Sequence, residues 1–289
     1  MNSNEDIVNN IINAINTIFD NLFTSIDSSL YKQLDNLVFI DASILNDKFF
    51  TKVFGTSASN GILLVANSLL IGIMIYFSIK FLMSNFTSTR IETPTQFVFK
   101  MIIFGICMNS SFFIVEQILN INSNICQSIR SIGEDIFHQD INFSNLIESM
   151  SSSITEGKDI FSMDGLIKGT FTVSLVSLVF SYALRYVTLK IFVLISPFAF
   201  LSLMTEGTSW FFRSWCKNIF SLLFIQIIVD IVLLILFAMD YESGNLLYKL
   251  IYIGGIYALI RANSIAREFA GGISTNVQAN LNMLKSIKG

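Results

Sequence analysis

The feature that most constrains this chain is a set of long apolar stretches that carry almost no charge. Residues 61–79 read GILLVANSLLIGIMIYFSI, and about 20 such residues in a helix cross the roughly 30 Å of hydrocarbon in a bilayer. Charged residues make up only 13% of the chain, against roughly 25% in ordinary soluble domains. The pattern argues against a soluble enzyme or a disordered linker and predicts an all-α, polytopic integral membrane protein.

We expect five to six transmembrane helices behind an N-terminal amphipathic helical region. The first two lie within 57–119, at 61–79 and about 97–119, and a short polar hinge with Pro94 joins them. The remaining three to four lie within 165–260.

The apolar stretch 166–204 is too long for one perpendicular pass, since its 39 residues would make a helix of about 58 Å. We therefore expect two spans, 166–184 and 187–204, with Arg185 near the turn between them. The alternative is one tilted helix up to Pro197, because 181–190 contains no Gly, Pro, Asn or Asp. Pro197 is expected to kink or break its helix, since proline lacks a backbone N–H.

Two further apolar segments follow. Residues 218–239 predict a span that carries Gln226 and Asp230 inside it. Residues 246–260 are apolar but short, so they read as a sixth span, a re-entrant segment or an interfacial helix. Residues 261–289 are expected to form a C-terminal tail.

Two polar regions complete the organisation. Residues 1–56 are amphipathic, and the helical period is clearest over 5–26. Its polar face has no Lys or Arg, which favours packing against protein helices over lying on anionic lipid. Residues 120–164 are polar and acidic and predict an extramembrane loop, read either as a functional loop or as a partly ordered cap.

A short segment before the span at 218–239 has the aromatic and basic residues typical of a membrane interface. We expect its interface anchors to be Trp210, Arg213, Trp215 and Lys217. With five spans and the N-terminus outside, the basic residues are denser in the inside segments, which favours that orientation.

Catalytic and metal-binding chemistry has little support in the sequence. The single histidine is His138, and the three cysteines are widely spaced, so His₃ and Cys₄ zinc sites and a C-x-x-C redox motif are excluded. Hydrolase, zinc-protease and phosphate-loop motifs are absent from the sequence. We expect no enzymatic activity, no cofactor and no metal.

Asp230 is the residue that most invites a functional interpretation. An ionised carboxylate in a span is costly and is a candidate functional group. Gln226 lies one turn earlier on the same face, so the two form a candidate intramembrane polar site. The competing interpretation is structural: Asp230 hydrogen-bonds a neighbouring helix or pairs with Lys100 or Lys190, and only fixes packing.

The sequence from residue 185 to residue 233 resembles the TrbL family of conjugal transfer proteins, the polytopic membrane subunits of type IV secretion systems. The resemblance extends over roughly 60–275. It is carried by the S-P-F-A-F segment at Ser196–Phe200, the polar turn at Thr205–Thr208, W-C-K at Trp215–Lys217, the span with Gln226, E-T-P at Glu92–Pro94, N-I-N-S-N at Asn120–Asn124, and GGIYALIRANSIAREFAGG at 254–272.

This resemblance implies a channel subunit in the bacterial cytoplasmic membrane that helps translocate DNA or protein. Its partners would be further copies of itself, other secretion subunits including cytoplasmic ATPases, and membrane lipid. Contact with transferred single-stranded DNA or protein would be transient, because the net charge of −3 offers no basic excess. The alternative is a small-solute transporter or permease that uses Asp230 and Gln226 in a central polar site.

Overall fold

The computed structural model describes residues 10–15, 17–18, 21, 28–55, 60–87, 93–146, 163–239 and 246–270. Over these residues every regular element is a helix, which confirms the all-α prediction. Most of the predicted helix at 5–26, and the tail beyond residue 270, lie outside the described residues.

Three helices are long and apolar enough to cross a membrane: α4 (Gly61–Thr87), α8 (Met163–Leu201) and α9 (Ser209–Phe237). A fourth candidate is the pair formed by α5 (Pro94–Asn109) and α6 (Ser111–Phe137). These helices fit a multi-pass membrane protein. The finer count of five to six spans stays a prediction.

The second predicted span, 97–119, is wrong as a single straight helix. The α5 helix ends at Asn109, and α6 leaves it at an angle of 59°. Ser110 makes the junction, and its N–H bonds to the carbonyls of Ile106 and Met108. The predicted loop at 120–164 is also corrected, because α6 continues to Phe137 and ends at His138 in a left-handed conformation with φ of 55°. Residues 147–162 of that loop lie outside the described residues.

The prediction of two spans over 166–204 is wrong, because α8 is one continuous helix from Met163 to Leu201. Arg185 therefore lies in the middle of a helix rather than at a turn. Pro197 does not break α8, although it cannot donate to the carbonyl of Val193 four residues earlier. The Ser196 hydroxyl donates to that carbonyl at 2.7 Å, which supplies the missing hydrogen bond.

Helix α10 (Leu246–Ala270) returns beside α9 and extends ten residues into the predicted tail. Its most apolar part, Leu250–Ala262, is shorter than a full span. A Cβ atom added to Gly255 would lie 2.4 Å from Cδ2 of Leu236 on α9. Gly255 thus permits the two helices to approach closely, as small residues do between membrane helices.

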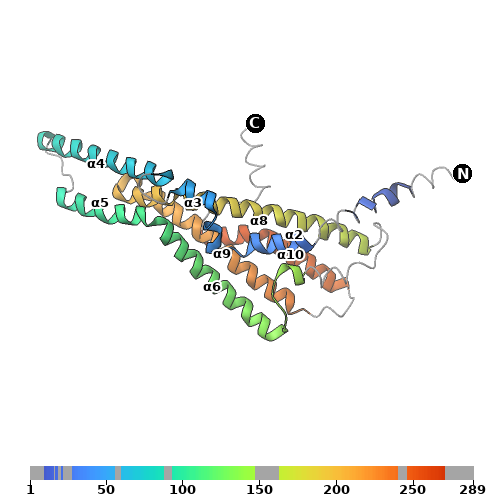
Figure 1. Ribbon diagram of the computed structural model, residues 1–289. Helices are drawn as coiled ribbons and strands as arrows, with labels where there is room; N and C mark the ends of the chain where they lie inside the picture. The colour runs from blue at the N-terminus through green and yellow to red at the C-terminus, as the bar shows by residue number, and fades with distance from the viewer. Residues whose placement is uncertain are drawn as a thin grey trace.

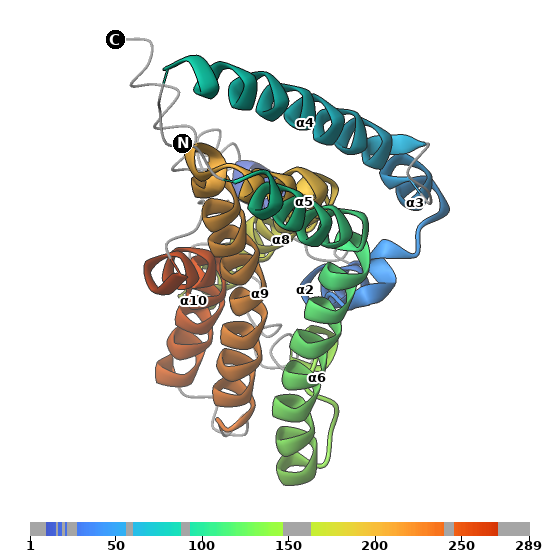
Figure 2. The same cartoon turned by 90° about the vertical axis from the view of Figure 1, so that its left-hand side faces the viewer.

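Helices α4 and α5 project together at one end of the molecule, and we call this pair the wing (Figures 1 and 2). Their contact includes stacked rings of Phe77 and Phe97, with centroids 3.6 Å apart. Helix α5 packs on α8, whereas α4 is covered very little, with 11% of its most apolar window buried against 56% for α9.

The segment 28–54 of the N-terminal region packs on the bundle near the middle of α8, whereas Ile11 and Ile18 before it are 53% and 57% exposed. It consists of α2 (Ser28–Val38), the short 3₁₀ helix η1 (Ala42–Leu45) and α3 (Lys48–Phe54). Asp41 and Asp47 cap the starts of η1 and α3 with their side chains. Leu34, Val38 and Leu45 are fully buried, so this region is part of the protein core.

Candidate functional site

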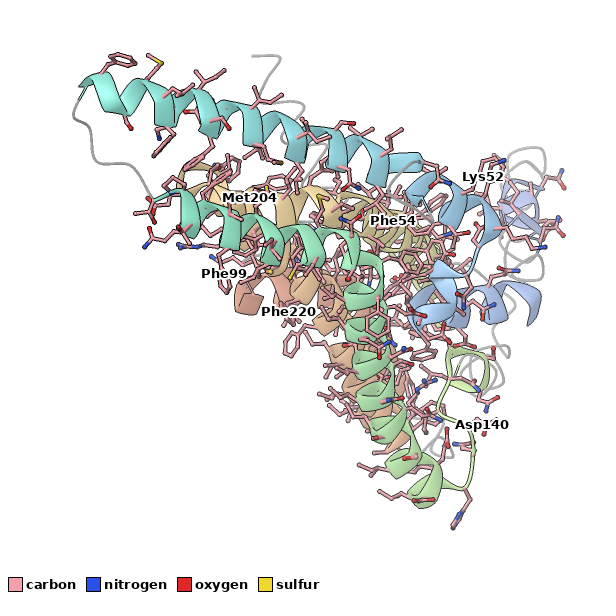
Figure 3. All side chains as sticks on the ribbon, turned by 60° about the vertical axis from the view of Figure 1, so that its left-hand side comes forward. Lys52, Phe54, Phe99, Asp140, Met204 and Phe220 are labelled. Carbon is pink, nitrogen blue, oxygen red and sulfur yellow. The ribbon has the colours of Figure 1, made fainter. Side chains whose placement is uncertain are left out.

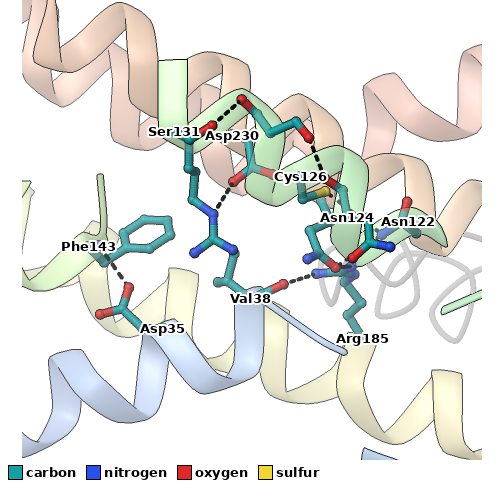
Figure 4. Close-up of polar contacts among 12 residues, drawn as sticks. Asp35, Val38, Asn122, Asn124, Cys126, Ser131, Phe143, Arg185 and Asp230 are labelled. Atoms are coloured by element: carbon teal, nitrogen blue, oxygen red, sulfur yellow. Dashed lines mark hydrogen bonds and ion pairs between the residues drawn. The ribbon is translucent and has the colours of Figure 1, made fainter. Parts of the chain in front are cut away.

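The predicted polar pair on α9 is buried inside the helix bundle. Gln226 is 1% exposed and Asp230 is 0% exposed. Gln226 contacts Asn122 of α6 and Arg185 of α8, and Asp230 contacts Arg130 of α6. We call these residues, with Asp35 beside them on α2, the polar cluster (Figure 4).

Asp230 pairs with Arg130 of α6, not with Lys100 or Lys190. The distance from Arg130 Nε to Asp230 Oδ1 is 3.6 Å, which makes this an ion pair rather than a hydrogen bond. The guanidinium of Arg130 also lies over the ring of Phe39, 4.1 Å from its centroid. Lys190 instead pairs with Asp47 at 3.6 Å and lies over the rings of Phe50 and Tyr186.

Arg185 is the residue that the sequence analysis missed. Its side chain is 1% exposed and donates three hydrogen bonds, which suit the fixed fork of a guanidinium. The acceptors are the carbonyl of Val38 at 3.0 Å, the carbonyl of Leu222 at 3.0 Å, and Oε1 of Gln226 at 3.4 Å. One cation thus joins α2, α8 and α9.

Gln226 Oε1 is shared by two donors. Besides Arg185, it accepts a hydrogen bond from Nδ2 of Asn122 on α6, at 3.4 Å. The Asn122 amide also contacts the Cys126 sulfur at 3.9 Å. Gln226 is therefore a connector between helices, and its acceptor oxygen is already occupied.

Asp35 extends the cluster at its outer side. Its carboxylate accepts hydrogen bonds from the Phe143 N–H and the Ser144 hydroxyl, both at 2.8 Å. This contact attaches α2 to the segment after α6. Burial raises the pKa of the Asp35 carboxyl above its usual value, and the two hydrogen bonds and the Arg130 charge oppose that rise.

The chemistry available to this cluster is cross-linking of helices. Two guanidinium groups, Arg130 and Arg185, are balanced by two carboxylates, Asp35 and Asp230. Asp230 and Arg130 meet only as an ion pair, since both Asp230 carboxylate oxygens and Arg130 Nε are buried without a hydrogen-bond partner among the described residues. Within the described ranges, no group of three or more His, Cys, Asp or Glu side chains is arranged to hold a metal ion.

The predicted interface anchors divide into two groups. Trp210, Arg213 and Lys217 are exposed, as side chains at a membrane interface would be. Trp215 is 3% exposed, so its side chain packs inside the bundle rather than on its surface. Its Nε1 donates to the Phe192 carbonyl at 2.9 Å, and its ring packs against Phe200 and Phe212.

Comparison of the chain with protein-family models, with curated proteins and with solved structures finds no match.

Proposed function

We propose that this chain is a TrbL-like channel subunit of a type IV secretion or conjugal transfer machine in the bacterial cytoplasmic membrane. In this proposal it acts by assembling with copies of itself and with other subunits, including cytoplasmic ATPases, and helps pass DNA or protein across the membrane. It performs no catalysis of its own. The resemblance of residues 185–233 supports this choice of machine.

The observation that carries the proposal is the wing. Helix α4 has large apolar side chains on all sides, and its exposed residues include Ile75, Tyr76, Ile79, Leu82 and Phe86. A helix that is apolar all round is normally buried. In α4 the surrounding protein covers only 11% of the most apolar window, which leaves a long surface for lipid and neighbouring subunits.

The polar cluster supports a role in assembly over a role in solute transport. A transporter needs polar groups that are free to bind and release a substrate at the centre of the membrane. Here Asp230 is paired with Arg130, and Gln226 accepts from Arg185 and Asn122. These contacts hold helices together, so we do not retain the permease as a second candidate.

The test is purification of the tagged full-length chain from its native host in mild detergent after brief cross-linking. We expect a large complex that contains several copies of the chain, a secretion ATPase and further envelope subunits. A deletion of the gene should abolish conjugal or protein transfer, and the full-length chain should restore it. Recovery of a monomer without such partners, together with unimpaired transfer by the deletion strain, would overturn the proposal.

A further inference from the structure

A cavity of about 620 Å³ lies between the wing and the turn that joins α8 to α9. The wing contributes Tyr76, Lys80 and Phe97, and the turn contributes Met204, Thr205 and Glu206. Figure 3 labels Met204, which lies between α4 and the bundle. This cavity is separate from the polar cluster, because Arg130, Arg185 and Asp230 do not line it.

The cavity presents one positive and one negative side chain. Lys80 and Glu206 both line it, and both are exposed. Among the residues that the structure describes, neither side chain forms an ion pair. The neighbouring hydroxyls of Thr205 and Thr208 are bonded to each other, and Thr208 also donates to the Ser202 carbonyl at 2.7 Å. The two charges are therefore the groups that remain available to a ligand.

A second cavity, of about 500 Å³, opens beside the first and is almost wholly apolar. The two share Ile73, Tyr76, Thr205 and Thr208. The second is otherwise lined by apolar side chains, chiefly Leu69, Phe198, Leu201, Trp210 and Phe211. A charged chamber continuous with an apolar groove matches a ligand with a charged head and a hydrocarbon chain.

We propose that these two cavities bind one glycerophospholipid whose headgroup carries a phosphate and a primary ammonium, as in phosphatidylethanolamine. Lys80 binds the phosphate, Glu206 accepts hydrogen bonds from the ammonium, and one acyl chain occupies the apolar groove. Charge-assisted hydrogen bonds of this kind are stronger than neutral ones. Trp210 lines the groove and is 65% exposed, and tryptophan is a residue that favours the headgroup region of a bilayer.

The charges select against other common headgroups. Phosphatidylglycerol would also satisfy Lys80, but its headgroup offers the Glu206 carboxylate only neutral hydroxyl donors and no positive charge, which makes weaker hydrogen bonds than an ammonium does. Phosphatidylcholine has a positive charge but no N–H to donate. This site does not depend on the proposed secretion function, because a membrane protein of any activity would meet these lipids.

The test measures lipid binding to the purified, delipidated full-length chain by native mass spectrometry. Phosphatidylethanolamine, phosphatidylcholine and phosphatidylglycerol with identical acyl chains are added in turn. We expect the wild type to bind the ethanolamine lipid most tightly. Because the two charges are exposed, the Lys80→Met and Glu206→Gln variants should each weaken it only about two- to five-fold. The matched controls Lys217→Met and Glu134→Gln change exposed charges outside both cavities and should leave binding unchanged.

Reversing the charge at position 206 tests the proposal by a change of lipid preference rather than by a loss of binding. Glu206→Lys should shift the preference of the protein from phosphatidylethanolamine to phosphatidylglycerol, since two cations then line the chamber. Thermal unfolding of each variant shows that it remains folded. Equal binding of the three lipids to the wild type, or an unchanged preference in Glu206→Lys, would overturn the proposal.

Discussion

Asp230 and Arg130 stabilise the bundle as an ion pair. Replacing one of the two residues should lower the stability of the protein by more than its share of the loss in the double variant. A buried charge that loses its partner is strongly destabilising, whereas loss of both charges is far less so. We expect Asp230→Asn and Arg130→Gln each to lower the thermal stability of the protein in detergent. The double variant should be more stable than the sum of the two losses predicts, with a coupling of about 0.5–3 kcal/mol.

A double-mutant cycle, with unfolding followed for the wild type and the three variants, measures this coupling. Asp135→Asn serves as the neutral control, because Asp135 is exposed on α6 and, five residues after Arg130, lies on another face of the helix. Strict additivity of the two single losses would show that Asp230 and Arg130 do not interact.

The contribution of Asp35 to the stability of the protein, through its attachment of α2, depends on pH. Burial raises the pKa of this carboxyl in the folded protein, so the folded state binds the proton more tightly than the unfolded state does. The contribution of Asp35 to stability is therefore full below the unfolded pKa and is lost as pH rises through the folded pKa. We expect Asp35→Asn, which can still accept from Phe143, to reduce this dependence without lowering stability at neutral pH.

Unfolding of the two proteins across the acid range checks this prediction, and Asp35→Leu provides the contrast. Leucine leaves the Phe143 N–H without its acceptor, which costs about 1–3 kcal/mol at every pH. The attribution to Asp35 would be contradicted if the wild type lost stability on acidification across the acid range and Asp35→Asn showed the same dependence of stability on pH.

Part of the polar cluster could be predicted from the sequence, because a polar residue within a long apolar stretch is easily recognised. Gln226 and Asp230 interrupt an apolar span, and both are buried in the structure. Their partners were missed since Arg185 was expected at a turn and Arg130 in a loop. The signal was present in α6, where the buried residues Val115, Leu119, Asn122 and Cys126 follow a helical period.

At the scale of the element, helices that are apolar on every side were the easiest to predict. The span at 61–79 falls within α4, and the span at 218–239 overlaps α9 and runs two residues past its end at Phe237. The predicted helix ends were wrong near residues 110 and 197, where the course of the chain depends on local hydrogen bonding. The chain bends by 59° at Ser110 inside one apolar stretch, and the Ser196 hydroxyl bonds to the Val193 carbonyl where α8 continues past Pro197. Neither effect changes the hydropathy pattern.

Adjacent glycines in α10 offer a matched test of close packing. A Cβ on Gly255 would meet the Leu236 side chain, whereas a Cβ on Gly254 would meet nothing within 4 Å. We expect Gly255→Ala to lower stability by about 1–3 kcal/mol, because it overpacks the contact between α9 and α10. Gly254→Ala should be neutral or stabilising by up to about 1 kcal/mol, since alanine favours the helix.

This prediction is checked by thermal unfolding of the two alanine variants in the same detergent. The comparison of their two stabilities is the critical result, because both substitutions raise helix propensity equally and only the one at Gly255 meets Leu236. If Gly255→Ala were as stable as Gly254→Ala, the close approach of α9 and α10 would be wrong.

At the scale of the whole molecule, the two ends differ in how their apolar surface is covered. The polar cluster and the N-terminal region bind α6, α8 and α9 to one another, and the core residues gather there. The wing has few such contacts, and Phe99 and Phe86 are 65% and 89% exposed on it. Figure 3 shows side chains of α4 directed away from the bundle.

The proposed function predicts that this uncovered surface contacts a neighbouring copy of the chain in the assembled machine. A photo-reactive amino acid at Ile75 or Leu82, which are 57% and 61% exposed on α4, should give protein adducts of twice the chain mass in native membranes. The control position is Phe180, which is 65% exposed on α8 outside the wing and should give mainly lipid adducts. Because exposure is similar at all three positions, the contrast reports on what lies beside each helix. Lipid adducts alone at both wing positions would show that the wing is covered by the bilayer and would remove the observation that carries the proposed function.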